Sequence, residues 1–263
     1  MQILKPGVEP QRFFDAVRAA SRRVLMLDYD GTLAPFRLDR DQAAPYPGVR
    51  ERLSALMAGH GTRVVLISGR TAHEVLQLAA VEPAPEVWGT HGWERLSPDG
   101  TYELAPLPPA AEAGLAQAHD VLDVRWAQRL ERKPASLAFH LRGLAPQETD
   151  AVQGHVQHAW EAIAACQGLE VHAFDGGIEL RIPGRSKGTA VRQLLAESDP
   201  ATVSAYLGDD RTDEDAFEAI APHGLGVLVR PELRETAAAW WIKPPEELLD
   251  FLDQWIAACR QGT

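Results

Sequence analysis

The chain has 263 residues, 45% of them hydrophobic and 24% charged, with a formal net charge of −11. This length and composition are ordinary for a globular protein with a substantial core. The negative charge argues against a basic surface for nucleic acid or anionic membranes, so we expect neither as a partner. Two cysteines are too few for a disulfide framework, and no segment resembles a signal peptide or a membrane span. We therefore expect a cytoplasmic monomer, with both cysteines serving as packing residues.

Short apolar runs rich in Val, Leu and Ile predict buried strands, because they do not alternate with polar residues. They lie at 24–27, 64–67, 203–207 and 226–229. Helical patterns lie between or after them, at 49–57, 72–80, 189–197, 213–220 and 246–258. Strands and helices in this order, joined by short loops, indicate an α/β fold with a parallel sheet.

The middle of the chain has a different pattern, which begins at a proline-rich segment, 105–109. Here we predict helices at 112–130 and 147–166 and strands at 136–142, 169–174 and 178–182. Such a unit is typical of a small α+β domain with an antiparallel sheet. We therefore predict a core formed by residues 1–104 and 183–263 and an inserted domain formed by residues 105–182.

Two aspartates follow the first predicted strand of the core directly. Asp28 stands at the end of the strand, and Asp30 lies two residues later, so both side chains can face one site. The carboxyl ends of parallel strands are where α/β sheets bind their ligands. Two close carboxylates are tolerable when a divalent cation lies between them or when one keeps its proton. The alternative is a solvated strand end followed by an Asp-Gly turn.

A second acidic group follows the strand at 203–207. Asp209 holds the position that corresponds to Asp28, and Asp210 and Asp213 follow it. The acids around 213–215 can also be explained by the start of a helix, where negative charge is favourable. That explanation does not account for Asp209, which precedes the helix.

Two further segments complete a possible anion site. Ser68 ends the strand at 64–67 and precedes Gly69, Arg70 and a helix, whose free N–H groups suit a phosphate. Lys187 precedes another helix and supplies a positive charge. Alone, each would be an ordinary turn or surface residue.

Together, the segments DYDGTL, SGR, Lys187 and GDD, in this order, resemble the haloacid dehalogenase superfamily of phosphotransferases. The longer stretches LDYDGTLAPF and GDDRTDEDAF are more specifically similar to the trehalose-6-phosphate phosphatase family. The resemblance spans nearly the whole chain. It implies a Rossmann-like core with an inserted C2-type cap domain, and hydrolysis of trehalose 6-phosphate to trehalose and phosphate.

The resemblance also implies roles for the acids. Asp28 would be the nucleophile that forms an aspartyl-phosphate, and Asp30 would be the general acid and then the general base. A Mg²⁺ ion would be bound by the carboxylates of Asp28 and Asp209 and by the backbone carbonyl of Asp30.

The remaining core residues of the motifs would act on the phosphoryl group or support the acids. Ser68 and Lys187 would contact the phosphoryl group. Asp210, Asp213 and Arg70 would have supporting roles.

In the predicted cap, the segments ERKPASLAFHLR and IELR are similar to the sugar-binding segments of the family, and GTHGWE is similar to a segment of its core. The substrate-binding residues implied in these segments are His91, Glu94, Glu131, Lys133, His140, Arg142 and Glu179. The family usually has Gly-Lys where this chain has Phe174-Asp175, so an expected sugar-binding lysine is absent.

Two alternatives remain open from the sequence. The first is the same chemistry on another sugar phosphate, such as glucosylglycerol phosphate. The second is a metal- or sugar-binding module without turnover, for which a second acid at Asp30 has no evident use.

Overall fold

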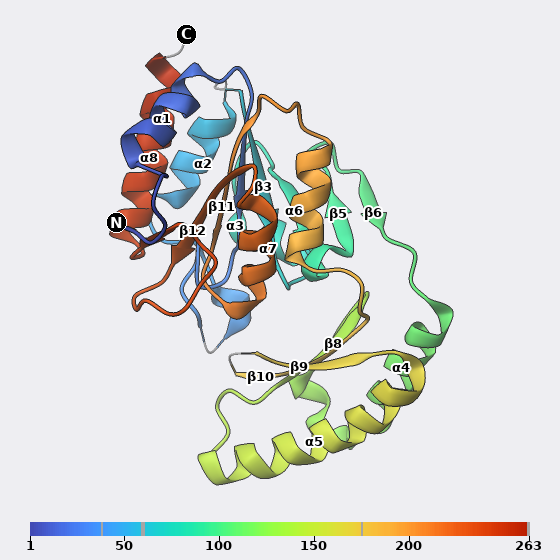
Figure 1. Ribbon diagram of the computed structural model, residues 1–263. Helices are drawn as coiled ribbons and strands as arrows, with labels where there is room; N and C mark the ends of the chain where they lie inside the picture. Colours follow the sequence, from blue (N-terminus) through green and yellow to red (C-terminus); the bar gives the residue numbers. More distant parts are fainter. Residues whose placement is uncertain (38, 59–60, 175, 262–263) are drawn as a thin grey trace. The chain divides into compact units, whose positions relative to one another are not determined.

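The computed structural model describes residues 1–37, 39–58, 61–174 and 176–261 of the chain. The chain divides into two compact units (Figure 1). The core unit comprises residues 1–103 and 186–263, and the inserted unit comprises residues 104–185. In the described residues, every helix is too short or too polar to cross a lipid bilayer.

The core unit contains a nine-stranded sheet with the order β1-β13-β12-β11-β2-β3-β4-β5-β6. The pairs from β13 through to β4 are parallel, and β1 and β5 pair antiparallel to their neighbours β13 and β4. The strands are β1 Gln2–Ile3, β2 Arg23–Leu27, β3 Thr62–Ile67, β4 Glu86–Gly89, β5 Glu94–Leu96, β6 Tyr102–Leu104, β11 Val203–Gly208, β12 Gly224–Val229 and β13 Trp240–Ile242. The predicted α/β class with a parallel sheet is confirmed.

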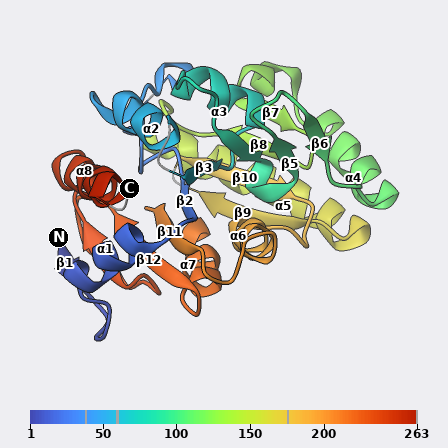
Figure 2. The same cartoon turned by 90° about the horizontal axis from the view of Figure 1, so that it is seen from above.

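Helices cover both faces of this sheet (Figure 2). They are α1 Pro10–Ala19, α2 Val49–Met57, α3 Ala72–Ala79, α6 Lys187–Ala196, α7 Glu214–Ile220 and α8 Glu246–Gln261. Along β2, Leu25 and Leu27 pack toward α1, α2 and α8, whereas Val24 and Met26 pack toward α6 and α7. Burial of each such side chain stabilises the fold by about 1.5–3 kcal/mol relative to exposure. Apolar residues on both faces explain why the strand does not alternate.

The inserted unit contains a four-stranded antiparallel sheet with the order β7-β8-β10-β9. Its strands are β7 Leu130–Lys133, β8 Ser136–His140, β9 Glu170–Phe174 and β10 Gly177–Arg181, and its α-helices are α4 Pro109–Asp120 and α5 Pro146–Gln167. The indole of Trp160 on α5 is fully buried and donates to the carbonyl of Ala118 on α4, 3.1 Å away. This bond and the apolar contacts around it join the two helices.

Several predicted elements differ from those observed. The helix predicted at 112–130 ends at Asp120, and a 3₁₀ segment, Val124–Arg129, and strand β7 follow it. The sequence pattern also did not indicate α1, β1, β4, β5, β6 or β13. Of the two cysteines, Cys259 is buried as expected, but Cys166 is exposed on α5, so its assignment as a packing residue is wrong.

Candidate active site

The ends of three neighbouring strands bring distant parts of the chain to one edge of the sheet. Strands β11, β2 and β3 lie side by side and parallel, and Asp209, Asp28 and Ser68 directly follow them. The amide of Asp28 continues the ladder by donating to the carbonyl of Leu207, 2.8 Å away. All three side chains belong to buried residues. This edge is the position at which open α/β sheets bind ligands.

Lys187 reaches the same edge from the start of α6. The helix begins with a capping box, in which Ser186 and Thr189 each bond the other's backbone N–H. This places Lys187 in the first turn, where its side chain is only 4% exposed. Its Nζ donates to Oδ1 of Asp28 at 2.7 Å and to Oδ1 of Asp213 at 2.8 Å.

Asp213 is completely buried and uses both carboxylate oxygens within the protein. Oδ1 accepts from Lys187 and from the hydroxyl of Tyr206, which is 2.5 Å away. Oδ2 accepts from the backbone N–H groups of Asp209 at 3.0 Å and Asp210 at 2.9 Å. Asp213 therefore orients Lys187 and fixes the loop that carries Asp209, whereas Asp210 contributes its backbone.

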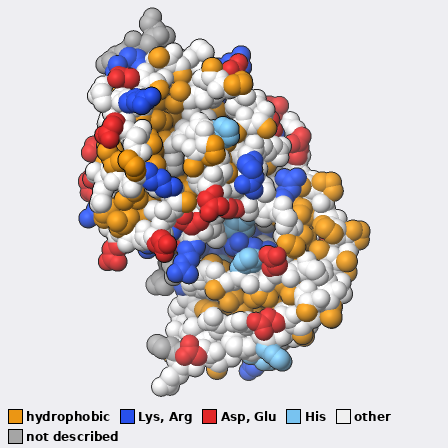
Figure 3. Space-filling view, viewed as in Figure 1, with side chains coloured by type: hydrophobic (Ala, Val, Ile, Leu, Met, Phe, Trp, Pro, Cys, Tyr) orange, Lys and Arg blue, Asp and Glu red, His pale blue; other side chains and the backbone are white. Residues whose placement is uncertain are grey.

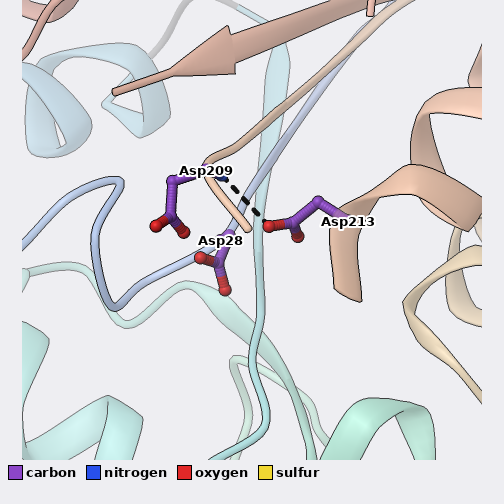
Figure 4. Close-up of side chains that lie close together, drawn as sticks. All are labelled: Asp28, Asp209 and Asp213. Atoms are coloured by element: carbon purple, nitrogen blue, oxygen red, sulfur yellow. Dashed lines mark hydrogen bonds between the residues drawn. The ribbon is translucent and has the colours of Figure 1, made fainter. Parts of the chain in front are cut away.

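Carboxylate oxygens of Asp28, Asp209 and Asp213 lie within 4.8 Å of one another (Figure 4). Burial raises the pKa of Asp28 to about 7, because Lys187 offsets only part of the desolvation and Asp213 adds repulsion. Burial also raises the pKa of Asp209 well above its ordinary value, with further repulsion from Asp28. Three buried carboxylates thus face one ammonium group, and negative charge is in excess.

The arrangement fits a divalent cation with oxygen ligands. Oδ1 of Asp209 is buried and accepts no hydrogen bond in the described part of the chain. Gly31 has a φ of +85°, and a Cβ there would lie 2.1 Å from Oδ2 of Asp209, so only glycine permits this approach. Each oxygen of Asp213 already accepts two hydrogen bonds, whereas each oxygen of Asp28 accepts one. The cluster therefore offers Asp28 and Asp209 as side-chain ligands of a hard cation.

Asp30 forms a two-pronged ion pair with Arg70. Its carboxylate accepts from Nε of Arg70 at 2.6 Å and from Nη2 at 2.8 Å. The backbone N–H of Arg70 in turn donates to Oγ of Ser68 at 3.1 Å. The guanidinium therefore connects the loop after β2 to the loop after β3.

The loop after β4 supports the loop that carries Ser68. Thr90 and His91 have φ values of +45° and +56°, a backbone conformation that is uncommon for residues with a side chain. The amide of His91 donates to the carbonyl of Ser68 at 2.9 Å, and its ring packs against Gly69. Glu94 is buried and accepts from the hydroxyls of Thr90 and Tyr102. The strained loop thus holds His91 near Ser68 and bonds Glu94, at the start of β5, through Thr90.

In the inserted unit, Glu179 on β10 is the centre of a buried polar cluster. Its Oε1 accepts from Nζ of Lys133 and from Oγ of Ser136, each at 2.8 Å. Its Oε2 accepts from Nε of Arg181 at 2.6 Å. Two cations thus bind one carboxylate, which is only 3% exposed.

The other predicted residues of this unit lie close to that cluster. Nε2 of His140 is 2.9 Å from Oε2 of Glu131, which is 4.0 Å from Nζ of Lys133. Arg142 packs against Gly176. Strands β7, β8 and β10 therefore bring together residues that the sequence separates by nearly fifty positions. Asp175 lies outside the described residues.

Sequence reasoning missed several polar partners. Thr32 donates to Oδ2 of Asp28 at 3.3 Å, and its position four residues after Asp28 could have indicated this contact. Ser136 lies three residues after Lys133, and Arg181 lies two residues after Glu179. This closeness along the chain could have indicated that they bond Glu179. Tyr206 gave no signal, because it lies within an apolar strand and its partner is seven residues away.

Solved structures share this fold over nearly the whole chain. The C-terminal domain of trehalose-6-phosphate phosphatase from C. albicans matches with a TM-score of 0.80 and 20% identity, covering 98% of this chain and 99% of that one. Trehalose-6-phosphate phosphatase from Aspergillus fumigatus matches with a TM-score of 0.67 and 25% identity, covering 97% and 99%.

Curated relatives agree with the structural likeness. A trehalose-phosphate phosphatase of Mycobacterium marinum is 32% identical over 244 residues, which cover 88% of this chain and 60% of the relative. One of Mycobacterium tuberculosis is 30% identical over 259 residues, covering 92% and 63%. The chain thus spans about 60% of the length of these relatives. The family model for trehalose-phosphatase matches residues 26–240. The chain belongs to the trehalose-phosphatase family.

Proposed function

We propose that the protein is a Mg²⁺-dependent phosphatase that hydrolyses trehalose 6-phosphate through an aspartyl-phosphate. The observation that carries this proposal is the convergence of Asp28, Lys187 and Asp209 at neighbouring strand ends, with excess negative charge and a buried Asp209 oxygen that accepts no hydrogen bond in the described residues. Membership of the family and the names of the relatives support the choice of substrate.

In the first step, a carboxylate oxygen of Asp28 attacks phosphorus, and the bond from phosphorus to the sugar oxygen breaks. Lys187 neutralises charge on the phosphoryl group while holding Asp28 in place. Ser68 donates a hydrogen bond to the phosphoryl group. Asp30 gives a proton to the departing sugar oxygen, which requires its ion pair with Arg70 to open beforehand.

In the second step, water attacks phosphorus, and the bond to the Asp28 oxygen breaks to release phosphate. Asp30, now ionised, takes the proton from that water. The two hydrogen bonds from Arg70 hold this carboxylate in a fixed orientation. A bound Mg²⁺ would add positive charge that stabilises the phosphoryl oxygens. Asp28 and Asp209 would hold it through their carboxylates, and Asp30 through its backbone carbonyl.

We propose that the inserted unit supplies groups that bind sugar hydroxyls. Charged carboxylates and cations with fixed geometry, such as Glu179 with Lys133, can accept from and donate to several hydroxyls at once. The other members of this proposed set are Glu131, His140 and Arg142, with His91 and Glu94 contributed by the core unit.

The decisive experiment is a panel of phosphate esters assayed for phosphate release with Mg²⁺ and with EDTA. We expect turnover that needs the cation and is highest for trehalose 6-phosphate. Preference for another sugar phosphate, such as glucosylglycerol phosphate, would agree with the proposed chemistry but reject trehalose 6-phosphate as the substrate. Binding of the esters without turnover of any of them would reject the proposal that the protein is a phosphatase.

A monomeric, cytoplasmic protein remains a prediction, which light scattering and cell fractionation would test. On the face seen in Figure 3, basic side chains stand among acidic and apolar ones. The expectation that nucleic acid is not a partner stays a prediction, which is based on the net charge of −11.

A further inference from the structure

The peptide that joins Asp209 to Asp210 is held from two sides. Its neighbouring N–H groups donate to Asp213, as described above. The carbonyl of Asp210 accepts from Nη2 of Arg234 at 2.6 Å, and the carbonyl of Asp209 accepts from the same nitrogen at 3.3 Å and from Nε at 3.4 Å. Arg230 adds a further donor to the carbonyl of Asp209 at 3.3 Å.

Arg234 is itself anchored, although it lies in the loop between β12 and β13. Nη1 pairs with Oε1 of Glu214, in the first turn of α7, and donates to the carbonyl of Glu235 at 2.8 Å. Oε2 of Glu214 accepts from the amide of Ala237 at 2.6 Å and from the hydroxyl of Thr236 at 3.3 Å. The side chain of Arg234 is only 17% exposed. The guanidinium is therefore a fixed, mostly buried donor.

We propose that Arg234 is a positioning residue for the divalent cation, which it serves by fixing the backbone that presents the Asp209 carboxylate. This inference rests on the cation site of the proposed function. Without the guanidinium, the carbonyl of Asp210 loses its charged donor and the carbonyl of Asp209 keeps only the bond from Arg230. The peptide can then rotate about the bonds that Asp213 still holds. Loss of a residue that orients a metal ligand typically weakens metal affinity about 10–100-fold.

The test measures binding of Mn²⁺ to the purified full chain by electron paramagnetic resonance, without substrate. Arg234→Gln should bind Mn²⁺ about tenfold or more weakly than the wild type. The matched control is Arg50→Gln, because Arg50 also donates to two backbone carbonyls, those of Ala79 at 2.7 Å and Leu78 at 3.0 Å, away from the cluster. Arg50→Gln should bind Mn²⁺ as the wild type does.

A second readout separates positioning from general damage. The Mg²⁺ concentration that gives half-maximal phosphatase activity should rise in Arg234→Gln, while kcat at saturating Mg²⁺ returns close to the wild-type value. If Arg234→Gln does not fold, Arg234→Lys replaces it, since lysine keeps the charge beside Glu214 but cannot donate from a planar fork. It should still bind Mn²⁺ several-fold more weakly.

The outcomes distinguish the two proposals. A wild-type chain that binds no Mn²⁺ would reject the cation site and, with it, the proposed function. A wild-type chain that binds Mn²⁺ and an Arg234 variant with affinity within twofold of it would reject the inference alone. An equal loss in Arg50→Gln would also reject it.

Discussion

The two units each contain a buried polar cluster, and the clusters differ in how their charges are balanced. In the core unit, Asp28, Asp209 and Asp213 face the single ammonium of Lys187. In the inserted unit, the carboxylate of Glu179 is bonded by two cations and a hydroxyl. One cluster is short of positive charge. In the other, Lys133 and Arg181 face two carboxylates, those of Glu179 and of Glu131, which lies 4.0 Å from Lys133, so the charges are matched.

Under the proposed function, this difference separates a site for chemistry from a site for recognition. Buried charge without a partner lowers stability and persists where function requires it. The proposed divalent cation would supply the charge that the core cluster lacks. A balanced cluster is stable as it stands and can present fixed donors and acceptors to neutral hydroxyls. Four predictions test this comparison.

Asp28→Asn should have the largest effect. The amide cannot attack phosphorus, so phosphate release from trehalose 6-phosphate should fall by roughly 10⁴-fold or more. The fold should be retained, because Lys187 keeps its bond to Asp213. A steady-state assay with circular dichroism measures both. Turnover within tenfold of the wild type would remove Asp28 from the nucleophile role.

Ser68→Ala should lower kcat by about 10²–10³-fold, because it removes one donor from a preorganised site. The control is Ser204→Ala. Ser204 is also buried, but it lies on β11 near the end of the strand that is away from Asp209. Its kcat should stay within twofold of the wild type. Equal effects of the two substitutions would mean that the loss at Ser68 is structural.

Glu179→Gln should reduce kcat/KM for trehalose 6-phosphate by roughly tenfold, through loss of charge-assisted hydrogen bonds worth about 1.5 kcal/mol. Activity on p-nitrophenyl phosphate, which has no sugar, should change less than twofold. Glu170→Gln, on the neighbouring strand β9, is the control, since Glu170 is exposed. Parallel losses on both substrates would contradict a role in sugar recognition.

The smallest effect concerns stability without metal. Burial raises the pKa of Asp28 to about 7 from 3.8, so the folded state favours the protonated acid. The resulting contribution to the stability of the folded state is fully present below about pH 4 and is lost as the pH rises through 7. In EDTA at pH 8, the free energy of unfolding of Asp28→Asn should therefore exceed that of the wild type by on the order of 1 kcal/mol. Thermal unfolding followed by circular dichroism measures this difference. The difference should shrink toward pH 5; a constant difference would contradict it.

Much of the core could be predicted because its signals are local. Apolar runs without alternation indicated the central strands, and the rule for parallel sheets placed Asp28, Ser68 and Asp209 at one edge. The inserted unit was harder to predict, since its antiparallel sheet pairs β8 with strands on either side of the long helix α5. Strand β7, which carries Glu131 and Lys133, was not predicted, and the predicted helix extended to its first residue, Leu130.

The sequence by itself determined the residue types and the chain order of the acids, the serine and the lysine, and so the class of chemistry. Tertiary structure alone decided which charges are balanced. It paired Asp30 with Arg70 across forty residues and brought Arg234 to the backbone of Asp209 from twenty-five residues away. The physical reason is that burial and hydrogen bonding depend on which segments fold next to one another, and residue spacing along the chain does not specify this.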